Sequence, residues 1–299
     1  MFKKMLKKLI EPKFTTPENN ILLLAMGAML SKQQWAINSD NINDYEFKIF
    51  SQFGDDGIIQ YLIKNLQIEN EIFIEFGVGN YLESNTRFLM MNNNWSGFVM
   101  DGSEQLTKIL TNQDWYWQYN ITHKSVFIDK TNINELLLDT GFTDIGLLHV
   151  DIDGNDYHLF DSIDLSKLNP AIVILEYNSV FGGDRAITVP YRRDFVRTKA
   201  HYSNLYWGAS LPAMVFVARK NGYSLIGCNN AGNNAYFIRN DLLNEKVKEL
   251  SVKKAYRESR FRESWNKDGE LSFLKGRERL EIIKGLEVIN VETGEKEII

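Results

Sequence analysis

The sequence contains little cysteine and no excess of positive charge. Cys228 is the single cysteine in 299 residues, which excludes an intrachain disulfide and a cysteine-rich zinc site. We therefore expect a reducing, cytoplasmic setting. Lys and Arg number 34 against 39 Asp and Glu, so the net charge is -5 at pH 7. Nucleic acid is not an expected partner, because its binding needs a broad positive surface.

Long apolar runs are missing as well. The run "ILLLAMGAML" at 21–30 is too short to span a bilayer, so no transmembrane segment is predicted. Lysines at positions 3, 4, 7 and 8 lie too far ahead of this run for a secretory signal peptide. We expect a helix that packs on the main domain or on a second subunit, which makes a homo-oligomer a candidate. Peripheral contact with an anionic membrane surface is the alternative.

Apolar residues are plentiful enough for a globular core, at 44% of the chain. The pattern predicts three parts. Residues 1–45 form a helical N-terminal extension, and residues 46–240 form the main domain. Residues 241–299 form a charged, mostly helical C-terminal extension that ends in a small hairpin turning at Thr293 and Gly294.

The main domain alternates short apolar runs with helical stretches. The runs at 72–77, 96–102, 125–130, 145–151 and 171–178 predict buried strands of a parallel sheet covered by helices on both faces. Two later strands, 223–228 and 234–239, are separated only by "NNAGN" and predict an antiparallel hairpin. The predicted fold class is α/β, with a mostly parallel seven-stranded sheet.

A glycine loop follows the first predicted strand in "IFIEFGVGN", residues 72–80. Gly77 and Gly79 allow a sharp turn and a close approach to a ligand, although such a loop can also be a turn without a ligand. A dinucleotide fingerprint needs a third glycine at position 82, which is Leu82. Glu75 also suits a cation better than a pyrophosphate. S-adenosylmethionine (SAM), which carries an ammonium and a sulfonium, fits these residues.

Two more acidic residues follow predicted strands. Asp101 ends the second strand, where doubly wound folds place an acceptor for ribose hydroxyls. Asp129 ends the third predicted strand and is a weaker candidate for a position near the adenine. For both residues, the alternative is an aspartate that caps a turn or a helix.

Together, "SQFGDDGII" (51–59), "FIEFGVGN", "SGFVMDGS", "VDIDGNDY" and "VILEYN" resemble the FkbM-like group of SAM-dependent methyltransferases, over about residues 50–240. The resemblance implies a Rossmann-like class I methyltransferase sheet and SAM as the cofactor. It also implies O-methylation of a sugar, a glycoside or a natural product, as in surface-polysaccharide synthesis. The residues that it assigns to SAM are Gln52, Asp55, Glu75, Gly77, Gly79, Ser84, Asn85 and Asp101.

Acidic side chains follow two neighbouring strands. Asp151 and Asp153 come after one strand, and Glu176 and Asn178 end the next, so all four are candidate ligands of Mg²⁺. This stretch also resembles metal-dependent O-methyltransferases, although Tyr177 separates two ligands that are adjacent in that group. In the alternative, no metal binds and carboxylates such as Asp151 orient the amino group of SAM. Asp156 is expected to open a helix.

An alcohol acceptor must lose a proton during methyl transfer, to a metal-bound group or to a side chain. The candidate bases are His201, His158 and Tyr177, whereas His149 lies within a buried strand and is expected to be a core residue. The segment 181–208 is rich in arginine and predicts an anionic small-molecule or glycan acceptor, such as a nucleotide-linked sugar. A solvated surface loop is the alternative.

The leading prediction is a SAM-dependent O-methyltransferase acting on a sugar-containing acceptor. Two other classes remain open. One is an NAD(P)-dependent oxidoreductase, against which Leu82 and Glu75 argue. The other is a module that binds SAM or a nucleotide without catalysis, which the dense acidic cluster disfavours.

Overall fold

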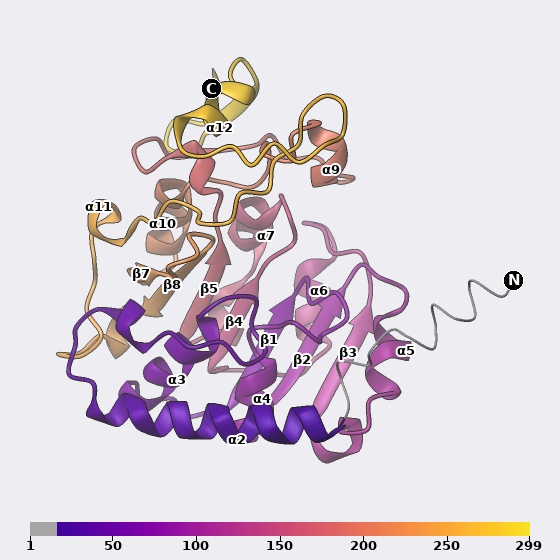
Figure 1. The fold of residues 1–299 in the computed structure, drawn as a ribbon, viewed down its shortest axis with the longest axis vertical. Helices are drawn as coiled ribbons and strands as arrows, with labels where there is room; N and C mark the ends of the chain where they lie inside the picture. The colour runs from indigo at the N-terminus through magenta and orange to yellow at the C-terminus, as the bar shows by residue number, and fades with distance from the viewer. Residues whose placement is uncertain (1–16) are drawn as a thin grey trace, which may run out of the picture.

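A computed structural model describes residues 17–299 of the chain (Figure 1). The four lysines of the predicted membrane contact lie outside the described residues. Helix α2 (Pro17–Gln33) runs along the bottom of the molecule in Figure 1, and the C-terminal segment lies at the top. The strands of a central sheet lie between them.

Within residues 17–299, seven strands form this sheet in the order β3-β2-β1-β4-β5-β8-β7. Their bounds are β1 (Ile72–Phe76), β2 (Ser96–Asp101), β3 (Ile121–Ser125), β4 (Leu147–Val150), β5 (Ile172–Glu176), β7 (Tyr223–Cys228) and β8 (Asn234–Arg239). Strands β1 to β5 pair in parallel, whereas β8 is antiparallel to both of its neighbours. The structure thus confirms the predicted fold class, including the antiparallel terminal hairpin.

Helices cover both faces of the sheet because the central strands are apolar on both faces. One core contains residues of α6 (Ile133–Leu138), α7 (Asp156–Ser162), α8 (Leu165–Leu168) and α10 (Leu211–Lys220). The other contains residues of α3 (Asp55–Asn65), α4 (Arg87–Asn93) and α5 (Leu106–Thr111). In β5, for example, Val173 and Leu175 face the first core and Ile172 and Ile174 the second.

The third strand lies earlier in the chain than predicted. It is β3, Ile121–Ser125, rather than residues 125–130, and it lies at the edge of the sheet. An edge strand needs apolar residues on alternate positions only, and β3 is buried at Ile121 alone. The apolar residues Phe127 and Ile128 come after the strand, where they line a cavity instead.

The C-terminal segment is less helical than predicted. It contains the short helices α11 (Val252–Ala255) and α12 (Arg277–Ile282), and β9 (Glu287–Asn290) pairs with β10 (Lys296–Ile298) as an antiparallel hairpin. This hairpin also pairs with β6 (Ile187–Thr188), which belongs to the segment after β5. The remaining short helices are α9 (Arg197–Ala200) and the 3-10 helices η1 (Gln34–Ala36), η2 (Ile42–Tyr45), η3 (Tyr116–Gln118), η4 (Ser179–Phe181) and η5 (Asn240–Leu242).

Helix α2 packs on α4 and α3 on one side and exposes apolar residues on the other. Ile21, Leu22, Met26 and Met29 are each more than half exposed. The expected contact with a second copy of the chain through this helix remains a prediction, which the mass of the protein in solution would test. Among the described residues, no helix is long and apolar enough to cross a membrane.

Candidate functional site

Two adjoining cavities lie at the carboxyl ends of the parallel strands. One has a volume of about 330 Å³ and a polar lining that includes Gln52, Glu75, Ser84 and Asn85. The other, of about 250 Å³, is lined by the polar residues Asp101, Asp153 and Asn155 and by apolar side chains of Phe127, Ile128, Ile152 and Phe195. Both cavities are lined by Gly77, Gly79 and Asp151. The glycine loop and the end of β4 therefore form the boundary between a polar half and a mainly apolar half.

The two glycines of the loop serve different purposes. Gly77 has φ +73°, and a Cβ atom there would lie 1.5 Å from the carbonyl oxygen of Asp151. Gly79 has φ +55°, but a Cβ atom there would meet nothing within 4 Å. Gly77 thus allows the loop after β1 to pack directly on the chain after β4, and Gly79 keeps space open beside the cavities.

Glu75, at the carboxyl end of β1, is buried and fully hydrogen-bonded. Its carboxylate accepts from the Ser84 hydroxyl at 2.6 Å, from the Asn85 and Thr86 amides at 3.0 and 3.1 Å, and from the Thr86 hydroxyl. His149 on β4, which pairs in register with Glu75, lies 2.9 Å from the same carboxylate through its Nδ1. Glu75 lines the polar cavity but acts first as the anchor of the loop before α4.

The electrostatics of this pair favour an ionised Glu75. Burial opposes ionisation of Glu75, but the bond and charge of His149 together with the hydroxyl donors lower its pKa. Burial likewise opposes protonation of His149, yet its bond to Glu75 and the charges of Glu75 and Asp151 raise its pKa. His149 is a buried, hydrogen-bonded residue, as predicted, and it also lines the polar cavity.

Asparagines of the β7–β8 connection complete the polar cavity, and sequence reasoning missed them. Asn233 and Asn234 both line it. Asp55 lies behind them, fully buried, where it accepts from the side chains of Asn229, Asn234 and Tyr236. Asp55 therefore holds the asparagines in place and does not itself line the cavity. The signal was present in "NNAGNN", which reads equally well as a hairpin turn.

The structure separates the two aspartates expected near the adenosine half. Asp101 ends β2 and accepts hydrogen bonds from the backbone amides of Gly79 at 2.8 Å and Ser103 at 2.7 Å. It also lines the mainly apolar cavity. Asp129 does not line it. Its carboxylate is buried, caps the turn at Thr131 and Asn132, and accepts from Arg193 at 2.7 Å. The prediction that Asp129 ends the third strand is wrong, because that strand ends at Ser125.

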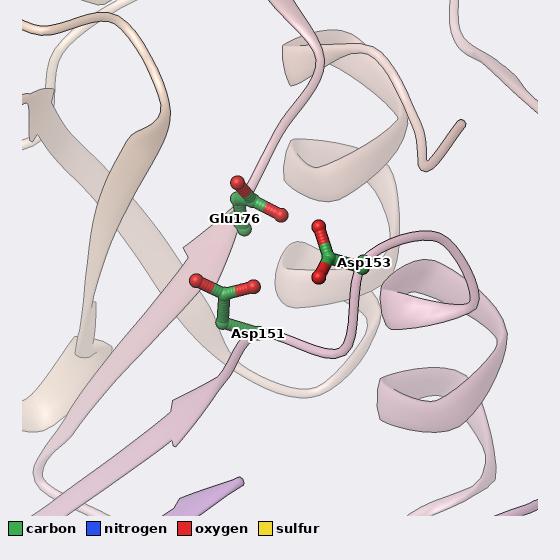
Figure 2. Close-up of side chains that lie close together, drawn as sticks. All are labelled: Asp151, Asp153 and Glu176. Carbon is green, nitrogen blue, oxygen red and sulfur yellow. The ribbon is translucent and has the colours of Figure 1, made fainter. Parts of the chain in front are cut away.

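Three carboxylates gather beside the boundary of the two cavities (Figure 2). Ligand atoms of Asp151, Asp153 and Glu176 all lie within 4.8 Å of one another, and Figure 2 shows that they come from the ends of β4 and β5. Asp153 is exposed and lies 3.3 Å from Arg197. Glu176 is buried, and its Oε2 has no hydrogen-bond partner among the described residues. The sequence-based expectation that these side chains meet agrees with this geometry.

Crowding shifts the titration of this cluster. Burial and the charge of Asp153 raise the pKa of Asp151 to about 6. Burial and the charges of Asp151 and Asp153 raise the pKa of Glu176 well above its ordinary value. Asp156, the first residue of α7 as predicted, accepts from the amides of Ile152 and Gly154, and burial raises its pKa to about 7. Like charges held this close favour binding of a cation or a proton.

Asn178, the fourth predicted metal ligand, is engaged in hydrogen bonds with other parts of the chain. Its amide nitrogen donates to the carbonyls of Leu205 and Trp207, both at 2.9 Å, and its oxygen accepts from Val180 at 3.0 Å. These bonds fasten the start of η4 to the segment after β6. The alternation along the chain predicts correctly that Tyr177 points to the opposite face, where it joins the first core together with Val173 and Leu175.

In the part of the chain that the structure describes, neither cavity is lined by any of the three residues predicted as bases. The Tyr177 hydroxyl is buried and donates to the carbonyl of Arg257 at 2.7 Å. His158 contacts the Val189 carbonyl through Nε2 at 2.8 Å, and His201 contacts the Ser203 hydroxyl through Nδ1 at 2.8 Å. Burial raises the pKa of Tyr177 and lowers those of both histidines. The catalytic assignments stay predictions without geometric support.

The cavities suit a ligand with one polar, charged end and one flat apolar end. An adenosine-like group matches the mainly apolar half, where Asp101 is an acceptor for hydroxyls. An amino-acid group matches the polar half, which offers carboxylate, amide and hydroxyl groups. The Oδ1 atom of Asn234 is buried there without a partner among the described residues, so it remains free to accept from an ammonium.

Comparison with models of known protein families finds a match to the methyltransferase FkbM domain over residues 59–223. This range is more than half of the chain and includes β1 to β5, the glycine loop and the acidic cluster. The C-terminal segment lies outside it. A search of curated proteins finds no match to this chain.

Proposed function

Because this chain belongs to the FkbM methyltransferase family and is a SAM-dependent methyltransferase, we propose that it methylates a hydroxyl group of a sugar-containing acceptor. The observation that carries the proposal is the acidic cluster beside two adjoining cavities that share Gly77, Gly79 and Asp151, because a hydroxyl acceptor must lose a proton close to the methyl donor. SAM has a mainly apolar adenosine half and a charged methionine half, which match the linings of the two cavities. With SAM bound across the two cavities, its methyl-bearing sulfur would lie at their boundary, beside the acidic cluster.

The described residues support a division of roles. Asp101 binds the ribose, and Asn234 with Ser84 and Asn85 binds the methionine end. SAM supplies an activated methyl group, so the protein must mainly align the acceptor and exclude water. The acceptor hydroxyl loses its proton to the acidic cluster, in which Asp151 lines both cavities.

Calorimetric titration with S-adenosylhomocysteine (SAH) tests the cofactor assignment. We expect SAH to bind at a single site and NAD to give no heat of binding. The change Asp101→Asn should weaken SAH binding roughly tenfold, because one acceptor for the ribose becomes a donor. Asp114→Asn, at an exposed aspartate away from the cavities, is the matched control. Tight binding of NAD without binding of SAH would contradict the proposal.

We also propose that the acidic cluster binds Mg²⁺. Carboxylate oxygens are preferred ligands of this ion, and the unpartnered, buried Oε2 of Glu176 supports a cation at this position. When bound, the ion would lower the pKa of the acceptor hydroxyl, and the proton would then leave to water, because the carboxylates would serve as ligands. Asp151, Asp153 and Glu176 would hold it. The competing arrangement uses Arg197, which already lies 3.3 Å from Asp153, as the positive partner of the cluster.

Titration of the SAH-loaded protein with MgCl₂ separates these arrangements. The changes Asp151→Asn and Glu176→Gln should each weaken Mg²⁺ binding roughly tenfold or more, because each removes a charged ligand. The control is Asp139→Asn, at an exposed aspartate that ends α6 and pairs with Lys124. If the unaltered protein shows no Mg²⁺ binding after treatment with EDTA, the cluster is not a metal site.

A further inference from the structure

A third cavity lies between the end of β5 and the C-terminal segment. Its volume is about 570 Å³, and its lining includes η4, Tyr256 and α12. Helix η4 begins three residues after Glu176, a stretch that spans at most about 10 Å when fully extended. The lining of the cavity therefore begins close to the acidic cluster, on the β5 side.

Arg279 is the unusual residue of this lining. Its side chain belongs to α12 and is only 4% exposed. Its Nε has no hydrogen-bond partner, and the guanidinium forms no ion pair within the described part of the chain. Burial lowers the pKa of Arg279, and the negative charge of Glu258 opposes this shift. A buried Nε–H without a partner, on a guanidinium that forms no ion pair, is costly, and an anion bound in this cavity would offset that cost.

The other charged residues of the lining do not remove this imbalance. Lys284 pairs with Glu281 at 3.3 Å, and Arg185 pairs with Glu297 on the hairpin. Asp184 and Glu258 are exposed carboxylates of the same lining. Arg277 is exposed and forms no ion pair within the described part of the chain.

Arg197 links the acidic cluster with the C-terminal segment, which also lines the cavity. The guanidinium of Arg197 lies 3.3 Å from Asp153 and 3.0 Å from Glu263 of the C-terminal segment. Its positive charge acts on both Glu176 and Arg279. A molecule with a hydroxyl at the cluster and a phosphate in the cavity would therefore bridge groups that the protein already couples.

We propose that this third cavity binds a phosphate or pyrophosphate group of the acceptor, with Arg279 as its main ligand and Arg277 at its edge. Arginine suits this role because its planar guanidinium can donate two parallel hydrogen bonds to an oxyanion. The inference rests on the proposed function, since it places the acceptor next to the methyl-transfer site. It narrows the acceptor to a sugar phosphate or a sugar linked to a diphosphate.

Calorimetric titration of the SAH-loaded protein with sodium pyrophosphate, at constant ionic strength, tests this site. We expect binding to the unaltered protein and a loss of affinity of roughly tenfold or more in Arg279→Gln. Lys296→Gln is the matched control, because it removes a paired, exposed cation of the C-terminal hairpin outside this lining and should leave the affinity unchanged. Absence of pyrophosphate binding, or equal affinity in Arg279→Gln, would overturn the inference.

Thermal unfolding of Arg279→Met provides a second measurement that does not depend on affinity. Without pyrophosphate, its Tm should equal or exceed that of the unaltered protein, because an unpaired buried charge is replaced by an apolar side chain. Pyrophosphate should raise the Tm of the unaltered protein only. A lower Tm without ligand, or binding of glucuronate in place of pyrophosphate, would contradict the phosphate assignment. Failure of SAH to bind would instead contradict the proposed function.

Discussion

Replacing Gly77 by alanine is expected to destabilise the protein by about 3 kcal/mol or more, because two costs add. An alanine at φ +73° is itself strained, and its Cβ would lie 1.5 Å from the Asp151 carbonyl oxygen. Backbone atoms form this contact, so no side chain can rotate away to relieve it. The loop after β1 or the chain after β4 must move, and SAH binding should fall by roughly a hundredfold. Urea unfolding and SAH titration measure the two effects.

Gly79→Ala is the control for this prediction. It introduces the same methyl group at a similar φ of +55°, but that group meets open space. Its cost in stability should be limited to the strain of about 1–2 kcal/mol. Equal destabilisation by the two changes would mean that the contact between Gly77 and Asp151 does not constrain the fold.

Replacing Glu75 by glutamine should cost about 3–5 kcal/mol, because it leaves the buried His149 without its charged partner. Within the described chain, both oxygens of Glu75 accept hydrogen bonds from the Ser84–Thr86 turn, and one also contacts His149. An amide has one oxygen and one NH₂ group, so it must turn a donor toward groups that are themselves donors. The free energy of unfolding, from urea denaturation, measures the cost.

Glu83→Gln is the matched control for Glu75→Gln. Glu83 also lines the polar cavity, but it is about half exposed, at 54%, and its ion pair with Lys48 is long, at 3.7 Å. Its replacement should change stability by about 0.5 kcal/mol or less. A similarly small effect of Glu75→Gln would show that the hydrogen bonds around Glu75 contribute little to the fold.

The sheet was predictable because its central strands are buried on both faces. In β4 and β5, all residues are buried, and such apolar runs stand out in a sequence. Strand β3 was misplaced because the apolar residues Phe127 and Ile128 follow the strand, where both line a cavity and Ile128 also joins the first core. The pairing of β6 with β9 was beyond prediction, since two residues, Ile187 and Thr188, carry no periodic signal and their partners lie far along the chain.

In the site too, some residues could be predicted from the sequence and others could not. Asp151 and Glu176 could be expected to meet because the ends of neighbouring parallel strands lie at one edge. The positions of Asp55 and Asp129 could not be anticipated, because a buried aspartate that holds a turn has the same local sequence as one that binds a ligand. Arg279 could not be identified from the sequence, because its candidate role depends on a buried Nε that has no hydrogen-bond partner among the described residues.

The pairing of β6 with the C-terminal hairpin has a consequence for how this protein can diverge. The glycine loop and the acidic cluster lie within residues 59–223, whereas α12 and the hairpin lie beyond them. With the proposed acceptor site in the third cavity, changes in α12 and the hairpin would alter acceptor binding while leaving the glycine loop and the acidic cluster unchanged. The choice of acceptor would then evolve mainly through the tail of the chain, and two enzymes with the same donor site could modify different molecules.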